Sequence, residues 1–344
     1  MKKLLIALAG FCMGTLCFAQ MLPDSTVQVC AYWDKGDVMV YDYTETRTST
    51  VNGVTVGTTS ASEKHVFEIT DATEDSYIVK LSFEDLVNTP LQTGAFNELA
   101  ERISENFWFE TKTNELGTVQ DIANEEKALE ACKAMIPVMT DRVLSKYTAQ
   151  ELKEEGTSRE KLIQQFMAGV CTEEFMESLC VKYVIPILLY HGARFNLDQE
   201  YTVSQTLMGI LGDNNLDVDW KFWAESEECS EDFVLIHSYT EADKEALTPI
   251  LKELILDSLQ EGLTPDEIAE LMSDPDELNE GLEELIQSMD ASVEQYSVIA
   301  IHLGSGYPYR WWLKRVTTLE EDDSTTVITE EKELTFSEDD YRNQ

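Results

Sequence analysis

The sequence predicts an α+β protein whose curved, mainly antiparallel sheet resembles half of a barrel and carries two helical insertions packed on it. Strand-like alternation occurs in three regions of the 344-residue chain, at about 27–122, 201–239 and 292–336. Helical periodicity fills the two intervals between them, at about 124–191 and 240–290. Because most connections between successive strands are short, we expect antiparallel pairing within one elaborated domain over residues 20–344.

The first nineteen residues have the organisation of a secretory signal peptide. Lys2 and Lys3 form a positive start, residues 4–16 form a short apolar run, and small residues stand at the two positions that matter for cleavage. We therefore expect cleavage between Ala19 and Gln20 and an exported protein, either periplasmic or secreted.

A lipoprotein is the alternative interpretation of this N-terminal segment, with Cys12 or Cys17 as the acylated residue. Bulky residues precede both cysteines, whereas lipidation favours small ones. No other run is long and apolar enough to suggest a transmembrane segment in the mature chain, since 181–189 is short and contains Pro186.

Acidic residues dominate the composition, with 66 Asp and Glu against 25 Lys and Arg and a formal net charge of −41. A field of this sign repels nucleic acid and anionic membrane surfaces, so we expect no nucleic-acid partner. The charge can serve simply as a solvating surface of an exported protein. It can also mark an acidic helical face that binds a protein partner, which is a second functional hypothesis.

Five cysteines remain after signal removal, and they are Cys30, Cys132, Cys171, Cys180 and Cys229. The odd number leaves at least one free thiol. No pair has the C-x-x-C spacing of a zinc ribbon or a redox motif. If one straight helix contained the cysteines at 171 and 180, about two and a half turns would separate them, which is too far for a disulfide.

The first strand region contains two hairpin signals. Asn52-Gly53 lies between β-branched residues, a pattern typical of a type I′ turn. Residues 77–83 alternate between apolar and polar side chains and pair with 65–70. A short helix is expected near 94–103, and a second hairpin joins 106–111 to 117–122.

Capping signals divide the first helical block. Asn124 can cap its first helix, and capping boxes begin at Thr148 and at Thr157. Residues 172–190 are expected to form a longer apolar helix that bends at Pro186.

The second helical block begins with an apolar stripe over 247–259. Later caps are expected at Thr264 and at 273–274, each followed by a proline at the first helical position. After this block the last strands are expected at 292–318, 325–329 and 333–336.

The stretch 292–318 organises the C-terminal region. Apolar residues occupy both alternating sets of its first strand, which predicts burial on both faces. Gly304-Ser305-Gly306 breaks the pattern as a turn with positive φ angles would. The strand that follows, 310–316, is rich in tryptophan and is the most basic short segment of an acidic chain.

This basic strand supplies the candidate ligand site. Arg310, Trp312 and Lys314 share one face, and a tryptophan between cations can hold an anionic or sugar-like ligand. In the alternative interpretation, the cations pair with the surplus acids and the tryptophans fill the core. The candidate ligand-binding residues are Tyr307, Tyr309, Arg310, Trp312 and Lys314.

Motifs for catalysis, metals and nucleotides are not found in the sequence. No serine lies in a nucleophile elbow, the four histidines are widely separated, and no glycine-rich phosphate loop occurs. The acidic stretch 213–219 lacks the glycine and the glutamate that an EF-hand needs. We therefore assign no catalytic residue, metal site or cofactor, and a hydrolase with dispersed carboxylates is the third hypothesis.

Two stretches, 107–124 and 301–318, resemble elements of uncharacterised exported proteins of Gram-negative bacteria that belong to domain-of-unknown-function families. The resemblance implies a half-barrel similar to periplasmic lipoprotein carriers and a binding or structural role in the cell envelope. It implies no catalytic residue. The leading hypothesis is a non-enzymatic exported protein that binds an apolar or amphiphilic ligand, or an envelope partner, in a groove of its curved sheet.

Overall fold

The computed structural model describes residues 25–88, 108–144, 158–208, 214–262, 275–321 and 324–337. The helix expected near 94–103, the capping box at Thr148 and the caps expected at Thr264 and at 273–274 lie outside these ranges. No helix of the described ranges is long and apolar enough to span a membrane.

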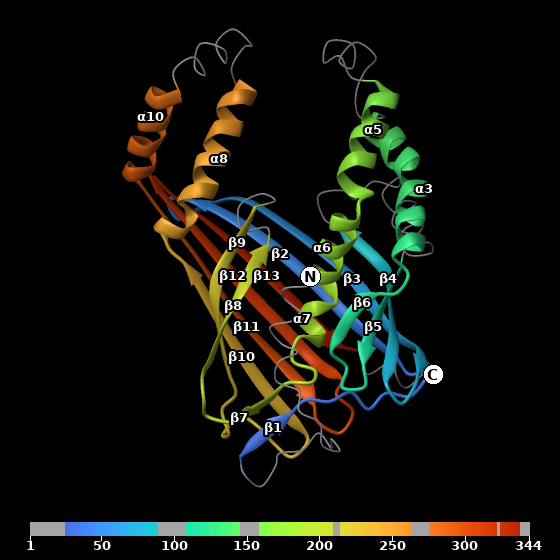
Figure 1. Cartoon of the computed structure of the whole chain (residues 1–344). Helices are drawn as coiled ribbons and strands as arrows, with labels where there is room; N and C mark the ends of the chain where they lie inside the picture. The colour runs from blue at the N-terminus through green and yellow to red at the C-terminus, as the bar shows by residue number, and fades with distance from the viewer. Residues whose placement is uncertain are drawn as a thin grey trace.

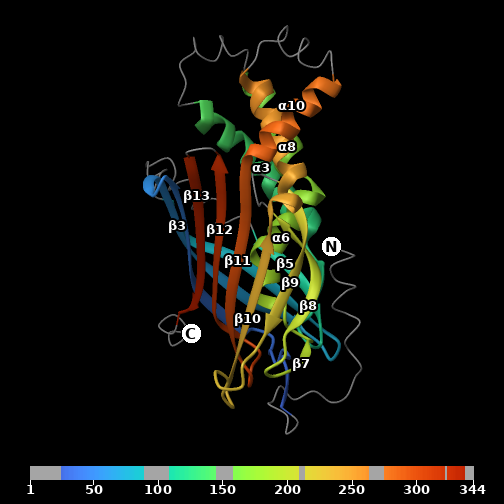
Figure 2. The ribbon, with the colours of Figure 1, turned by 90° about the vertical axis from the view of Figure 1, so that its left-hand side faces the viewer.

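One large curved antiparallel sheet organises the described residues and confirms the predicted fold class (Figures 1 and 2). Its strand order is β6-β5-β4-β3-β2-β13-β12-β11-β10-β9-β8. The N-terminal half of the sheet consists of β2 (Val38–Val51), β3 (Val54–Ala72), β4 (Ser76–Asn88), β5 (Trp108–Asn114) and β6 (Val119–Ile122). The C-terminal half consists of β8 (Tyr201–Met208), β9 (Asn215–Trp223), β10 (Phe233–Ala242), β11 (Met289–His302), β12 (Pro308–Glu321) and β13 (Ser324–Phe336).

The two halves meet where β13 pairs with β2. The last strand of the sheet in chain order therefore lies beside the first. A separate small sheet pairs β1 (Thr26–Gln28) with β7 (Arg194–Asn196). The predicted type I′ turn between β2 and β3 is confirmed, since Asn52 and Gly53 have φ angles of 50° and 76°.

Strand β13 differs from the two short strands expected at 325–329 and 333–336, because it runs without a break. The polar residues Glu330, Glu331 and Lys332 interrupt the apolar alternation, which suggested a gap. Each of them instead has an oppositely charged neighbour on an adjacent strand, so the charges are accommodated within the ladder.

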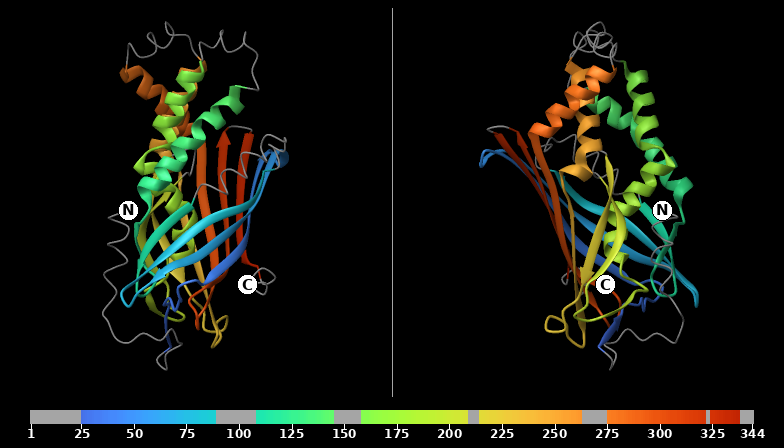
Figure 3. Two further views of the ribbon diagram at one scale, coloured as in Figure 1. Left: turned by 90° about the vertical axis from the view of Figure 1, so that its right-hand side faces the viewer. Right: turned by 60° about the vertical axis from the view of Figure 1, so that its left-hand side comes forward.

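The helices form two groups on the sheet. The first contains α3 (Glu125–Leu144), α5 (Arg159–Val170), α6 (Glu173–Tyr183) and α7 (Ile185–Leu188), and the second contains α8 (Lys244–Gly262) and α10 (Pro275–Ser288). Helix α7 contacts β12, whereas α8 and α10 contact β11. In Figures 1 and 3 both groups extend past one end of the sheet, and Figure 1 shows them standing apart there.

Two predicted helix features need correction. Ser158, not Thr157, caps α5, because its hydroxyl accepts a hydrogen bond from the Lys161 backbone N–H. The long helix predicted over 172–190 begins at its cap Thr172 but is divided into α6 and α7 at Val184, just before Pro186.

Strand β11 is buried on one face only, contrary to the prediction. Ile299 and Ile301 face the helices and are buried, while Tyr296 and Val298 on the outer face are half-buried. In Figure 2 the strands β10–β13 face the viewer, and no helix of the described residues lies over them. The outer apolar residues shield one another across neighbouring strands and do not need a second layer.

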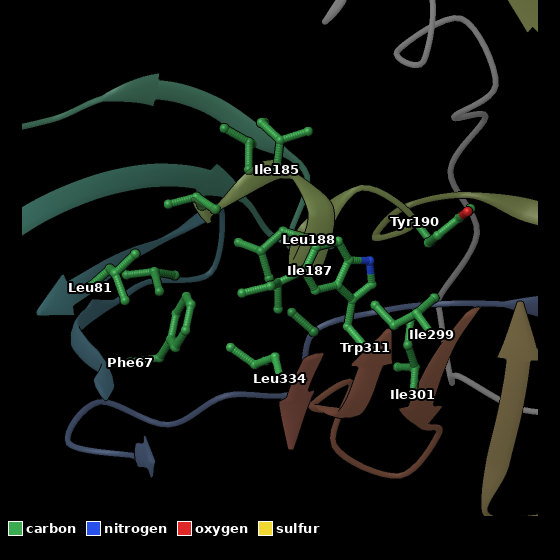
Figure 4. Close-up of a cluster of buried hydrophobic side chains, with 14 of the residues drawn as sticks. Phe67, Leu81, Ile185, Ile187, Leu188, Tyr190, Ile299, Ile301, Trp311 and Leu334 are labelled. Atoms are coloured by element: carbon green, nitrogen blue, oxygen red, sulfur yellow. The ribbon is translucent and has the colours of Figure 1, made fainter. Parts of the chain in front are cut away.

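The larger apolar core fills the space between the first helical group and the inner face of the sheet (Figure 4). Ile187 and Leu188 of α7 belong to the same apolar cluster as Phe67 of β3 and Trp311 of β12. A second cluster lies under α8 and α10 and includes Leu247, Ile286 and Val293. Burial of each such side chain contributes roughly 1.5–3 kcal/mol, so these contacts fix the helices on the sheet.

The five cysteines of the described chain, at positions 30, 132, 171, 180 and 229, are free thiols. Cys171 ends α5 and Cys180 lies in α6, so the single straight helix considered for them does not form.

A tight contact locks the turn before β12 against the N-terminal segment. Gly306 has a φ angle of 73°, and a Cβ atom built there would lie 2.1 Å from the carbonyl oxygen of Cys30. The buried His191 donates from Nε2 to the Gly306 carbonyl at 2.7 Å. Burial lowers the pKa of His191 to about 4, so the ring is neutral at pH 7.

We predict that Gly306→Ala lowers the free energy of unfolding by at least about 2 kcal/mol, because it combines an unfavourable φ with a backbone clash. Urea unfolding followed by circular dichroism measures the change. Gly57→Ala is the matched control, since a Cβ at Gly57 meets nothing within 4 Å, and we expect a change within about 0.5 kcal/mol. Equal effects of the two substitutions would contradict the argument.

The buried His191 also predicts a pH dependence. Its folded pKa lies below the unfolded value, so the unfolded chain binds the extra proton and stability falls as pH drops from about 6.5 to about 4. This group accounts for at most about 3 kcal/mol. In His191→Gln, whose amide can still donate to Gly306, the loss of stability between pH 7 and pH 4 should be smaller by about that amount. An unchanged loss in urea titrations at both pH values rules the mechanism out.

Candidate functional site

Three of the candidate residues from the sequence lie together on the outer face of β12. Arg310 forms an ion pair with Glu333 at 2.6 Å, and Lys314 pairs with Glu331 at 3.4 Å. The Trp312 ring meets the edge of Tyr296 at a centroid distance of 5.9 Å. The predicted division of faces is therefore correct, and both cations are occupied by glutamates of β13.

The two candidate tyrosines lie away from this group. The Tyr307 hydroxyl donates to Asp37, and its ring stacks on Trp33 at 6.0 Å. Tyr309 is 38% exposed and contacts Phe233 and Phe336 near the end of the sheet. The five residues thus do not converge on one cavity, and their role in ligand binding stays a prediction.

A different group of charged residues gathers on the inner face of the sheet. Strand alternation points Arg315 inward with Trp311 and Leu313, and its cross-strand neighbour on β13 is Glu330. Helix α6 adds a lysine from above. We call this group the charged strip, and its members are Glu45, Arg47, Lys182, Arg315, Glu330 and Lys332.

Within the charged strip two carboxylates lie among four cations. Glu45 is 3.6 Å from Lys332 and 3.8 Å from Lys182. Glu330 is 3.6 Å from Arg315 and 3.7 Å from Arg47. The two acids thereby connect three strands and one helix in a single network.

The Arg315 guanidinium has a further partner on β11. Its Nε and Nη2 atoms both donate to the Gln295 side-chain oxygen, at 3.0 and 2.8 Å. Gln295 is a neutral acceptor, so these two hydrogen bonds fix the position of the guanidinium without placing a negative charge beside it.

Exposure changes along the charged strip. The Arg315 side chain is 11% exposed, whereas those of Lys182 and Arg47 are 42% and 54% exposed. Burial lowers the pKa of Arg315 and of Lys332. Burial alone would raise the pKa of Glu45, but the adjacent Lys332 and Lys182 lower it overall. The network therefore has a buried end and an end that faces solvent.

Aromatic residues border the charged strip on the side of β3 and β4. Tyr43 donates to Glu45 at 3.1 Å and stacks on His65 at 4.6 Å. Tyr183 of α6 meets the edges of this pair and lies under the Lys182 ammonium. Burial raises the pKa of Tyr43, so its hydroxyl stays protonated and can donate to the carboxylate.

Apolar residues lie on both sides of the charged strip along β12. Leu313 packs against the larger core, and Leu319 packs against the cluster under α8 and α10. Arg315 stands between them on the same face. A charged band with apolar surface on either side can hold a molecule that has both a polar and an apolar part.

A pocket and a hydrogen-bonded histidine lie outside the charged strip. A shallow pocket of about 480 Å³ over β8–β10 is lined by acids including Asp217, Asp219 and Glu241. The described residues contain no cluster that could hold a metal ion.

On the outer face, His237 lies 2.5 Å from both Glu228 and the Tyr296 hydroxyl. Burial and nearby glutamates raise the pKa of Tyr296, which disfavours its use as a nucleophile.

We predict that Glu45→Gln lowers the free energy of unfolding by about 2 kcal/mol, because it leaves Lys332 and Lys182 close together without their shared carboxylate. Glu331→Gln is the matched control, because Glu331 pairs with Lys314 on the exposed outer face, and we expect a change within about 0.5 kcal/mol. Urea denaturation at pH 7 measures both. Similar losses for the two variants would show that the inner network is no stronger than a surface pair.

No protein-family model and no curated protein matches the sequence. Among solved structures, a lipovitellin structure described by its lipid–protein interactions gives a TM-score of 0.41 at 10% identity. The match covers 88% of this chain and 25% of the lipovitellin chain, so the protein spans about a quarter of that length. The CymD monoaromatic hydrocarbon channel gives a TM-score of 0.13 at 7% identity, with 89% of each chain covered. Similarities this distant identify neither a family nor a function for this chain.

Proposed function

We propose that the protein is a non-enzymatic binding protein that holds an amphiphilic ligand against the inner face of its curved sheet. The polar part of the ligand contacts the charged strip, and its apolar part lies along the neighbouring apolar side chains. The signal-like N-terminus supports a role outside the cytoplasm, in the envelope or in the surrounding medium.

The observation that carries this proposal is the position of the charged strip. Placing charges between a sheet and a helix costs several kcal/mol in lost hydration, and apolar residues would join the same elements at least as well. The sheet and α6 nevertheless place four cations and two carboxylates between two apolar clusters. A charged network of this cost is more typical of a ligand-binding site than of a purely structural contact.

Only part of the inner face is filled by the protein's own side chains. The remaining part can receive the apolar part of the ligand. Side chains of α7 and the sheet occupy the larger core, so that region is closed (Figure 4). Beyond the charged strip, Leu319 and Ile328 lie on the inner face and are half-buried. The two helical groups extend past this end of the sheet and stand apart from each other in Figure 1. We place the apolar part of the ligand here.

Two measurements test the proposal. Native mass spectrometry of the full chain, purified without detergent from its own compartment, should show a bound small molecule that organic solvent removes. The extracted protein should then bind the neutral apolar dye N-phenyl-1-naphthylamine with a rise in fluorescence, and Ile328→Asp should weaken that binding at least tenfold. Thr329→Asp, on the outer face of the same strand, is the control. A chain that carries no amphiphile and does not bind the dye is not a binding protein of this kind.

A further inference from the structure

We infer that the charged strip receives an anionic head group, a carboxylate or a phosphate, so that the ligand is an anionic amphiphile. This inference rests on the proposed function and specifies its ligand.

The local charge is opposite to that of the whole chain. The protein has a formal charge of −41, yet the charged strip has four cations and two carboxylates. The nearby Glu63 lies 2.7 Å from His65, and counting it still leaves the cations in excess. A positive region within a strongly negative protein attracts an anion and disfavours a cationic ligand.

The ion pairs of the charged strip are long. Their nitrogen–oxygen distances are 3.6 to 3.8 Å, whereas Arg310 and Glu333 on the outer face are 2.6 Å apart. Direct charge-assisted hydrogen bonds are shorter, about 2.7–2.9 Å. The cations are therefore held near the acids without close contact, and a lysine ammonium carries three donors. A further oxygen anion can enter without breaking a short ion pair.

An anionic ligand can reach the charged strip from its exposed end. Lys182 of α6 and Arg47 of β2 are the most exposed members, and each pairs with one of the two carboxylates. Lys332 is more buried and shares Glu45 with Lys182. An anionic group that enters beside Lys182 meets this second ammonium next, where lower hydration strengthens the attraction. A neutral sugar head or a quaternary amine gains nothing comparable.

Four probes with one dodecyl chain test the inference on the full-length protein after removal of bound material. They are dodecanoate, dodecyl phosphate, dodecyl maltoside and dodecyltrimethylammonium, each used below its micelle concentration in displacement of N-phenyl-1-naphthylamine. We expect dodecanoate or dodecyl phosphate to bind at least tenfold more tightly than dodecyl maltoside, and the ammonium probe to bind weakest. The better anion identifies the head group as a carboxylate or a phosphate.

Variants assign this preference to the charged strip. Lys182→Met and Lys332→Met should each reduce the affinity for the preferred anion at least fivefold and leave that for dodecyl maltoside unchanged. Lys80→Met is the control, because this lysine pairs with Glu68 on the opposite face of the sheet. Lys182 is 42% exposed, so its substitution still tests the inference should Lys332→Met fail to fold.

The outcomes separate the inference from the proposed function. Equal binding of maltoside and anions overturns the anionic head group but keeps an amphiphile-binding protein. An anion preference that survives both lysine substitutions also overturns the inference, because the charged strip then only supports α6. Binding of none of the probes or of the dye removes the proposed function itself.

Discussion

The pairing of β13 with β2 is the interaction on which the rest of the structure depends. It runs from Thr326 opposite Val51 to Phe336 opposite Tyr41 and joins strands from the two ends of the described chain. Without it, β2–β6 and β8–β13 would form separate sheets, and β2 and β13 would become open edges. The same pairing sets Lys332 directly opposite Glu45, so the register that joins the sheet also builds the charged strip. Fold and candidate site therefore share one physical origin.

The helices then determine which part of the inner face stays available. The first group closes the region near α7 with an apolar core, and the second covers the opposite edge of the sheet. The charged strip lies between these two contacts, and α6 contributes Lys182 to it. On the outer face, side chains such as Tyr296 and Trp312 pack across strands without a covering layer. The molecule thus has an inner face specialised by its helices and an outer face stabilised by cross-strand contacts.

Local chemistry predicted much of this fold from the sequence. Asn52-Gly53 defined a hairpin, Thr172 defined a helix start, and alternation assigned Arg310 and Trp311 to opposite faces of their strand. The charged strip was not predicted, because it depends on pairing between distant segments, such as Thr50 and Val327, which are 277 positions apart. Alternation also cannot show whether a second layer covers a face, which is why β11 was expected to be buried on both sides. The candidate site was assigned to the outer face of β12 because Arg310 and Lys314 lie there. The sequence alone does not show that Glu333 and Glu331 of the neighbouring strand pair with these two cations.

The meeting of the first and last strands has a consequence for how the polypeptide matures. The central ladder cannot close until the final segment has been synthesised, so an emerging chain holds β2 with one side unsatisfied for most of its production. Contacts of such long sequence separation form slowly, because a large loop must close before they contribute any energy. The polypeptide therefore has a long interval in which β2 lacks one of its two neighbouring strands. An architecture joined by its last described strand cannot complete its sheet until that strand has been made.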